Sequence, residues 1–219
     1  MGKQMQPIRD LETVHRITVE LSRREDRRGR RMFLLWVVGV NMGLRVGDLV
    51  ELKVGDLRGE NFTYMPNKQE HKKGAHNITV PVPYEVKRVI DARCADMDDG
   101  DWLFQSQKKN ATRKRDPSRV PKRKERPVNP GAISRQTARR DMIEIGKYCG
   151  LDMDVGCHTM RKTFGYQYYQ QSHDIAFLQE WFYHNSPATT LIYIGVSLDN
   201  FTKAVSRSPF KGMLQGCDL

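Results

Sequence analysis

The sequence predicts an α+β fold that is mainly helical, with a small antiparallel three-stranded sheet. Two observations carry this prediction. Apolar residues recur at helical spacing along most of the chain. A short central region instead holds β-like runs, and the clearest of them, residues 77–81, is rich in β-branched residues. The chain therefore has helices first, then a small sheet and then more helices, which is the order of an α+β chain.

Length and composition limit the class of protein. The chain has 219 residues, and its 37 Lys+Arg against 26 Asp+Glu give a formal net charge of +11. This length favours one large domain, or one domain with a small extension. The longest apolar run, Met32–Val40, is far shorter than the ~20 residues that span a bilayer. Residues 1–10 lack the apolar stretch of a signal peptide. We therefore expect neither a membrane protein nor a secreted one.

The first elements are predicted to be helices. Over residues 8–27, apolar residues keep helical spacing and Asp10 can cap the helix start. Gly29 interrupts the pattern. Residues Arg30–Gly43 are apolar on nearly every face, which predicts a buried helix that ends at Gly43. A short amphipathic turn follows, with apolar side chains at positions 46, 49, 50 and 52.

The predicted sheet comes next. Its three strands are expected at residues 53–57, 61–67 and 76–82. The polar stretch Gln69–Ala75 would be the hairpin loop between the second and third strands. A helix is predicted over residues 84–97, and Trp102–Phe104 forms a small apolar anchor after it.

A strongly basic segment follows this anchor. Residues 108–126 hold ten basic and two acidic side chains, with two prolines and almost no apolar residues. Such a segment cannot pack, so residues 108–130 are predicted to form a mobile basic loop inside the domain. A polyanion is the simplest partner for it, and nucleic acid is the commonest polyanion. A solvated loop that only aids solubility is the alternative.

Helical patterns dominate the rest of the chain. Ser134, Asp174 and Ser186 each stand where an N-cap is needed, and Pro187 suits a first helical position. The pattern predicts helices over residues 135–149, 158–172 and 175–183, one that starts at Ser186–Pro187, and a last one over about 198–206.

The cysteines suggest neither a metal site nor a redox site. None of the four forms a C-x-x-C pair, and Cys157 beside His158 is a poor ligand pair because adjacent residues rarely face one ion. We expect reduced thiols, no metal and no cofactor.

Five residues are candidates for chemistry on a phosphodiester. His158 and Arg161 share one helix face, and His184 falls in the turn before the helix that has Tyr193 at its far end. Arg45 follows a predicted helix end, where its side chain can point into a cleft. Guanidinium groups match phosphate oxygens with a planar fork of donors, and a phenol can act as a covalent nucleophile.

The same residues carry a family resemblance. Met42–Leu52 and His158–Phe164, followed by His184 and Tyr193, resemble the signature boxes of the tyrosine recombinase (phage integrase) family. The separations, 23 residues from Arg161 to His184 and nine from His184 to Tyr193, match the family spacing. The resemblance implies the fold of a tyrosine recombinase catalytic domain.

The resemblance also implies a mechanism. Tyr193 would attack the scissile phosphate and form a 3′-phosphotyrosyl link, releasing a 5′-hydroxyl. Arg45 and Arg161 would hold the non-bridging oxygens. His184 would donate a further hydrogen bond, and His158 would transfer a proton near the tyrosine. Neither metal nor ATP is required.

A lysine in the hairpin would protonate the leaving 5′-oxygen. Family members place it about six residues after an apolar residue such as Phe62, which selects Lys68. Lys72 and Lys73 precede Gly74, a pairing that relatives also show, so they stay open as alternatives. Asp48 matches an acidic position of the first box and is expected to brace the site.

The resemblance gives the expected domain organisation. It covers roughly residues 10–207, and we expect an N-terminal helical extension at 1–28, the catalytic domain at 29–207 and a C-terminal tail at 208–219. The family usually carries a further helical domain that closes around DNA as a clamp. Only some thirty residues precede the catalytic pattern here. A minimal recombinase, a fragment, or a protein that borrows its second clamp half is expected.

The leading hypothesis is therefore a site-specific DNA recombinase. It implies double-stranded DNA as the partner, a homo-tetramer on paired sites, no membrane, and a cytoplasmic, nucleoid-associated location in a prokaryote or phage. No accessory or excision factor can be identified from the sequence. A nicking-closing enzyme like topoisomerase IB and a non-catalytic or accessory DNA-binding protein of the same fold are the alternatives. The presence of the nucleophile with its four partner residues speaks against the latter.

Overall fold

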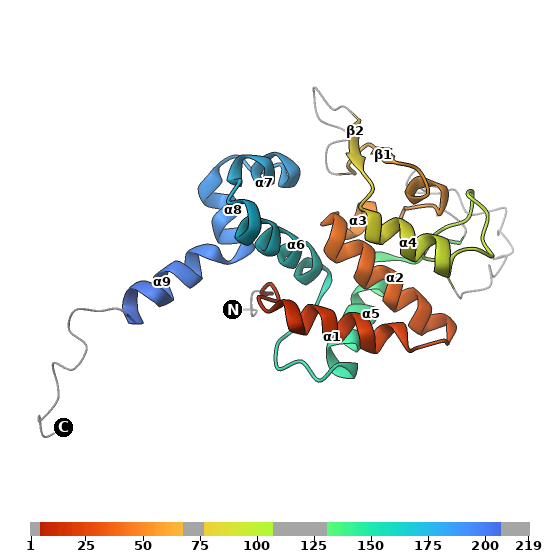
Figure 1. Cartoon of the computed structure of the whole chain (residues 1–219), viewed down its shortest axis with the longest axis horizontal. Helices are drawn as coiled ribbons and strands as arrows, with labels where there is room; N and C mark the ends of the chain where they lie inside the picture. Colours follow the sequence, from red (N-terminus) through yellow and green to blue (C-terminus); the bar gives the residue numbers. More distant parts are fainter. Residues whose placement is uncertain (1–4, 68–76, 107–130, 207–219) are drawn as a thin grey trace, which may run out of the picture.

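The computed structural model describes residues 5–67, 77–106 and 131–206. Within these ranges the fold is mainly helical, with one small antiparallel sheet, as predicted (Figure 1). The hairpin lysines at 68, 72 and 73, the basic loop at 108–130, Cys217 and the tail at 208–219 lie outside the described residues. The helices are α1 (Leu11–Ser22), α2 (Arg27–Met42), α3 (Val46–Leu49), α4 (Tyr84–Arg93), α5 (Arg135–Tyr148), α6 (Cys157–Ser172), α7 (Ile175–Phe182), α8 (Pro187–Ile194) and α9 (Val196–Ser206).

The core is built around α2, because its residues from Met32 to Met42 are apolar except for Asn41. Trp36 and its neighbours on α2 are fully buried. The shorter α1 packs against it through Ile17 and Leu21, and the indole N–H of Trp36 donates to the Thr18 hydroxyl at 2.9 Å. Figure 1 shows α1 and α2 lying side by side. The predicted division between residues 1–28 and the catalytic domain stays a prediction.

Side-chain caps fix where the helices begin. The predicted caps Asp10, Ser134, Asp174 and Ser186 are confirmed, because each side chain accepts a hydrogen bond from a backbone N–H of the first turn. The start of α2 differs from the prediction. It begins at Arg27, since the Asp26 carboxylate accepts from the N–H groups of Arg28 and Gly29, and Gly29 lies inside the helix.

The prediction of a third strand was wrong. The sheet among the described residues has two strands, β1 (Asn61–Tyr64) and β2 (Ile78–Pro81), with Phe62 opposite Val80. Residues 53–57 instead turn into a short 3-10 helix at Gly55–Leu57. The cause is local: the Asp56 carboxylate accepts from the Lys53 N–H at 2.8 Å, which favours a turn over an extended chain. Lys53 keeps one isolated bridge, to Trp102.

The helix α6 links the main core to a second apolar cluster. This cluster is formed by α7, α8 and the start of α9, with Leu178, Phe182 and Ile194 fully buried in it. Figure 1 shows α6 between this cluster and α2, and α9 extending away from the other helices. The fold therefore brings the ends of α2, α7 and α8 together around one face of α6.

The segment before α1 is hydrogen-bonded to α6 and forms an ion pair with α9. The Ile8 N–H donates to the Thr163 hydroxyl at 2.9 Å, and the Gln167 amide donates to the carbonyls of Ile8 and Arg9. Arg9 also pairs with Asp199 of α9 at 2.8 Å. In the ranges that the structure describes, every helix is too short or too polar to cross a membrane.

Candidate active site

The two arginines of the predicted site converge from different elements. Gly43 ends α2 in the left-handed conformation, with φ of 58°, and turns the chain so that Arg45 is the N-cap residue of α3. The Arg45 guanidinium donates to the Phe182 carbonyl at 2.8 Å and lies 5.5 Å from the centroid of the Tyr183 ring. The end of α7 thus fixes the direction of Arg45.

Arg161 is held more tightly still. Its side chain is buried, donates to the carbonyls of Gly43 and Trp181, and lies 4.3 Å from the centroid of the Phe182 ring. Burial lowers its pKa to about 10, so the guanidinium stays charged at neutral pH. Since both arginines bond to the last residues of α7, their guanidiniums are held in a fixed relation to each other.

The predicted nucleophile lies beside the predicted proton carrier. The Tyr193 hydroxyl is 3.3 Å from Nδ1 of His158, and the two rings meet edge to face. Tyr193 is in the last turn of α8, whereas His158 is in the first turn of α6. Their contact therefore depends on the packing of α8 against α6.

His184 completes the group. It stands in the turn between α7 and α8, as predicted, with Nδ1 at 3.1 Å from the Thr190 hydroxyl. Its ring lies 5.0 Å from the Tyr193 ring, centroid to centroid. The structure thus brings together the five residues that the sequence identifies outside the hairpin: Arg45, His158, Arg161, His184 and Tyr193.

The environment sets the protonation of the Tyr193–His158 pair. Burial raises the pKa of Tyr193, although Arg161 and Arg45 oppose this shift. Burial also lowers the pKa of His158, and the positive charges of Lys162, Arg161 and Arg45 lower it further. At neutral pH the phenol is therefore protonated and the imidazole is largely neutral, so that one can donate and the other accept.

A cavity of about 380 Å³ opens beside these groups and is lined by Arg45, His158 and Arg161, among others. Cys157 also lines it, and burial raises the pKa of that thiol to about 11. A larger cavity, of about 920 Å³, lies between β2 and α7 and reaches His184. Arg45, His158 and Arg161 therefore line the smaller cavity, whereas His184 lines the larger one.

Asp48 braces the wall of the smaller cavity. Its Oδ1 accepts from both the backbone N–H and the side-chain amide of Asn67, each at 2.9 Å. Its Oδ2 is buried and has no hydrogen-bond partner within the described ranges. Asn67 is the last described residue before the segment that holds Lys68, so Asp48 fixes the chain at the entrance to that segment.

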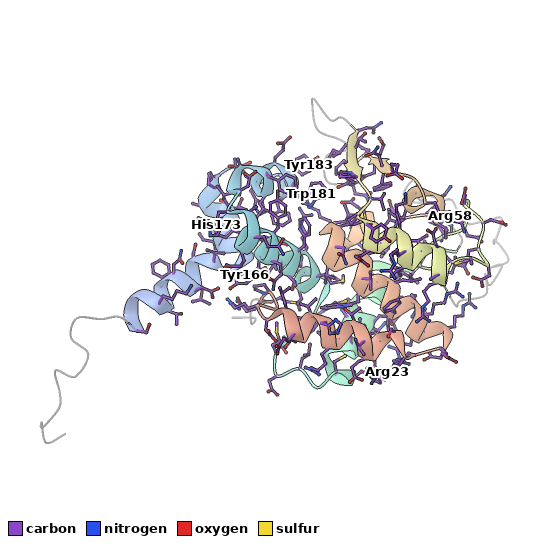
Figure 2. All side chains as sticks on the ribbon, viewed as in Figure 1. Arg23, Arg58, Tyr166, His173, Trp181 and Tyr183 are labelled. Carbon is purple, nitrogen blue, oxygen red and sulfur yellow. The ribbon has the colours of Figure 1, made fainter. Side chains whose placement is uncertain are left out.

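The sequence does not indicate the contribution of the C-terminal end of α7. The carbonyls of Trp181 and Phe182 hold the arginines, and the Trp181 indole donates to the Met42 carbonyl at 3.2 Å. Tyr183 ends the helix with a positive φ of 54°. Figure 2 shows Trp181 and Tyr183 at the end of α7 that faces α3. No motif marks these residues, because their role depends on backbone atoms and on contacts distant in sequence.

No group of three or more candidate metal ligands occurs within the ranges that the structure describes. The lysine assignment among Lys68, Lys72 and Lys73 stays a prediction, since all three lie outside those ranges.

Comparison with known proteins gives the family. The sequence model of the phage integrase family matches residues 12–199. YoeC of Bacillus subtilis (strain 168), a probable integrase/recombinase, is 32% identical over 195 residues, which are 89% of this chain and 92% of that protein. Tyrosine recombinase XerA of Pyrococcus furiosus is 29% identical over 183 residues, 81% of this chain and 54% of that protein.

A solved structure shows the same fold. The XerH site-specific recombinase, bound to palindromic difH substrate in a post-cleavage complex, superimposes with a TM-score of 0.62 at 19% identity. The match covers 94% of this chain and 54% of that one, so the chain spans about half the length of XerA and of XerH. The family match over most of the chain, together with the identity to YoeC, shows that this protein belongs to the phage integrase family, the tyrosine recombinases.

Proposed function

We propose that the protein is a site-specific DNA recombinase that cleaves and rejoins strands through a 3′-phosphotyrosyl intermediate at Tyr193. One observation carries the proposal: the Tyr193 hydroxyl lies 3.3 Å from His158 Nδ1, in a site that also holds two immobilised guanidiniums. A buried phenol beside a neutral imidazole suits nucleophilic attack, and the guanidiniums suit the charge that develops on phosphorus oxygens.

The arginines are organised before DNA arrives. Each guanidinium has five N–H donors, and Arg45 and Arg161 use some of them on backbone carbonyls. Arg161 also contacts the Tyr193 hydroxyl, and the donors that remain can bind the non-bridging oxygens of the scissile phosphate. His184, oriented by Thr190, supplies a further donor to the same phosphate. Such preorganised donors stabilise a transition state without having to reorient during the reaction.

The chemical step exchanges one ester for another. His158 accepts the phenolic proton of Tyr193, and the phenolic oxygen forms a bond to phosphorus. The bond from phosphorus to the 5′-oxygen breaks, and that oxygen keeps the electron pair. Lys68 donates the proton that makes it a 5′-hydroxyl. The phosphotyrosyl ester conserves the bond for rejoining, so a 5′-hydroxyl of either strand can reverse the step without ATP.

The partner in this proposal is double-stranded DNA, bound by a homo-tetramer on paired sites in the cytoplasm of a prokaryotic cell, whether the gene belongs to the cell or to a phage. The net charge of +11 favours a polyanionic partner. A strand exchange needs two duplexes and four cleavages, which is the reason for a tetramer. The basic loop at 108–130 would add phosphate contacts and make binding depend steeply on salt.

The test is a covalent trap. Wild-type protein is incubated with a library of nicked duplexes of random sequence, and adducts that resist detergent are isolated and mapped by mass spectrometry. We expect an adduct on the peptide that contains Tyr193 and none with Tyr193→Phe. Tyr169→Phe, which changes another tyrosine of the same cluster, is the matched control and should react normally.

The other outcomes separate the alternatives. An adduct that survives in Tyr193→Phe contradicts the assignment of the nucleophile. Adducts on nicked duplexes, without Holliday junctions from intact duplexes of the same sequence, indicate a nicking-closing enzyme instead. DNA binding without an adduct, across the whole library, indicates a binding protein that lacks catalysis.

The pH dependence of cleavage should show the protonation of His158. Since burial and three cationic neighbours lower its pKa below the ordinary value of 6.5, the imidazole can accept a proton at pH 7 and loses this ability only at lower pH. We expect the second-order rate of adduct formation to fall on the acid side with a midpoint below pH 6.5. His158→Asn should react slowly and lack this limb. A midpoint above pH 6.5 in the wild type contradicts the prediction.

A further inference from the structure

Lys162 is an enclosed charge that the mechanism above does not use. It follows Arg161 on α6, and the residue is only 4% exposed. Within the described ranges no carboxylate lies at ion-pair distance from it, and its pKa is lowered by burial and then by the positive charge of Arg9. An ammonium that loses part of its hydration is stabilised by a compensating contact.

Lys162 makes this compensating contact with the ring of Tyr193, the proposed nucleophile. The Lys162 Nζ lies 5.0 Å from the centroid of the Tyr193 ring, within the range of a cation–π interaction. His158 is four residues earlier on the same helix, so both side chains leave the same face of α6. The imidazole contacts the Tyr193 hydroxyl and the ammonium lies near the ring. Side chains of one helix therefore contact both the hydroxyl and the ring of the tyrosine.

The position of Tyr193 at a helix end explains why contact with its ring matters. It sits in the last turn of α8, an eight-residue helix that ends at Gly195 in the left-handed conformation. A side chain near a helix end can swing about its χ1 bond, and a change of rotamer would carry the hydroxyl away from His158. The edges of the Phe182 and His184 rings limit the swing on other sides.

We propose that Lys162 is a positioning residue for Tyr193: its ammonium holds the ring so that the hydroxyl stays at His158 and faces the scissile phosphate. This inference rests on the function proposed above. Positioning of a reacting atom to within a fraction of an ångström has a large influence on rate, whereas it leaves the binding of the rest of the DNA unchanged.

The test compares two variants of this lysine. Lys162→Met keeps the length of the side chain and removes the charge, and Lys162→Arg keeps the charge. With a nicked duplex recovered from the wild-type adducts, at saturating concentration, we expect adduct formation about tenfold slower in Lys162→Met and within threefold of wild type in Lys162→Arg. The affinity for the same duplex should change less than twofold in both. Lys147→Met, at an exposed position of α5, is the matched control.

A stability measurement excludes a merely structural role. Because methionine removes an enclosed charge without opening a cavity, Lys162→Met should unfold at the same or a higher denaturant concentration than wild type. Slower chemistry in an equally or more stable protein supports the proposal. A wild-type rate in Lys162→Met overturns it, as does an equal loss of rate, affinity and stability in both variants.

A second readout does not depend on activity. In protein labelled with ¹³C in the tyrosine rings, the Tyr193 signal is identified by its loss in Tyr193→Phe. We expect this signal to shift and broaden in Lys162→Met and to stay near its wild-type position in Lys162→Arg. An unchanged signal in Lys162→Met overturns the inference. If the wild type forms no adduct at all, the proposed function fails, and the ring signal still tests the contact.

Discussion

Arg161→Lys will form the covalent adduct about a hundred- to a thousandfold more slowly than the wild type, which is the effect of removing one preorganised donor from a comparable site. Lysine keeps the positive charge but lacks the planar fork of donors. It cannot bond to the carbonyls of Gly43 and Trp181, lie on the Phe182 ring and still present two donors to a phosphate. The measurement is the single-turnover rate with a nicked duplex at saturating concentration.

The control for this variant is Arg88→Lys, on the exposed face of α4, where the arginine pairs with Glu85 and lies 5.7 Å from the centroid of the Tyr84 ring. It should react at the wild-type rate. Circular dichroism and a denaturant titration must show that Arg161→Lys is folded under the assay conditions. A folded Arg161→Lys protein that reacts within tenfold of the wild type contradicts the role given to the guanidinium.

Gly43→Ala will lose both stability and cleavage. The residue has a left-handed conformation, with φ of 58°, and an added Cβ would collide with the Phe164 ring. The conformational cost is about 1 kcal/mol, and forced repacking adds ~1–3 kcal/mol, so the free energy of unfolding should fall by roughly 2–4 kcal/mol. Cleavage should fall as well, because the Gly43 carbonyl anchors Arg161 and the same turn places Arg45. Denaturant titration and the single-turnover rate measure the two effects.

Gly150 provides a matched control for this change. It has almost the same backbone conformation, with φ of 60°, but no atom lies within 4 Å of an added Cβ. Gly150→Ala should therefore show only the conformational cost, about 1 kcal/mol, and an unchanged rate. If the two alanine variants lose equal stability and both cleave normally, the packing of Gly43 against Phe164 has no influence on the site.

Local chemistry explains which parts of the fold could be predicted. Helix starts depend on one side chain and the N–H groups next to it, so Asp10, Ser134, Asp174 and Ser186 could be identified as caps from the sequence. The strand expected at 53–57 failed for the same kind of reason. Its apolar residues resemble a strand, but a single aspartate bonds to the backbone three residues earlier and closes a turn.

The site could be predicted in part. Its five motif residues have fixed spacings along the chain, and the structure brings them together. What supports them could not be predicted, because the carbonyls of Trp181 and Phe182 and the ring contact of Lys162 join elements that are remote in sequence. Backbone carbonyls are present at every residue, so composition holds no sign of which ones hold an arginine.

The protonation state of the Cys157 thiol affects the selectivity of the proposed chemistry. It shares a cavity with His158 and the two arginines, where an ionised sulfur would compete with a phenol for phosphorus or trap stray electrophiles. With a pKa of about 11, only on the order of one such thiol in ten thousand is a thiolate at pH 7. Burial therefore keeps the Cys157 thiol protonated, so that this sulfur does not compete with the Tyr193 oxygen.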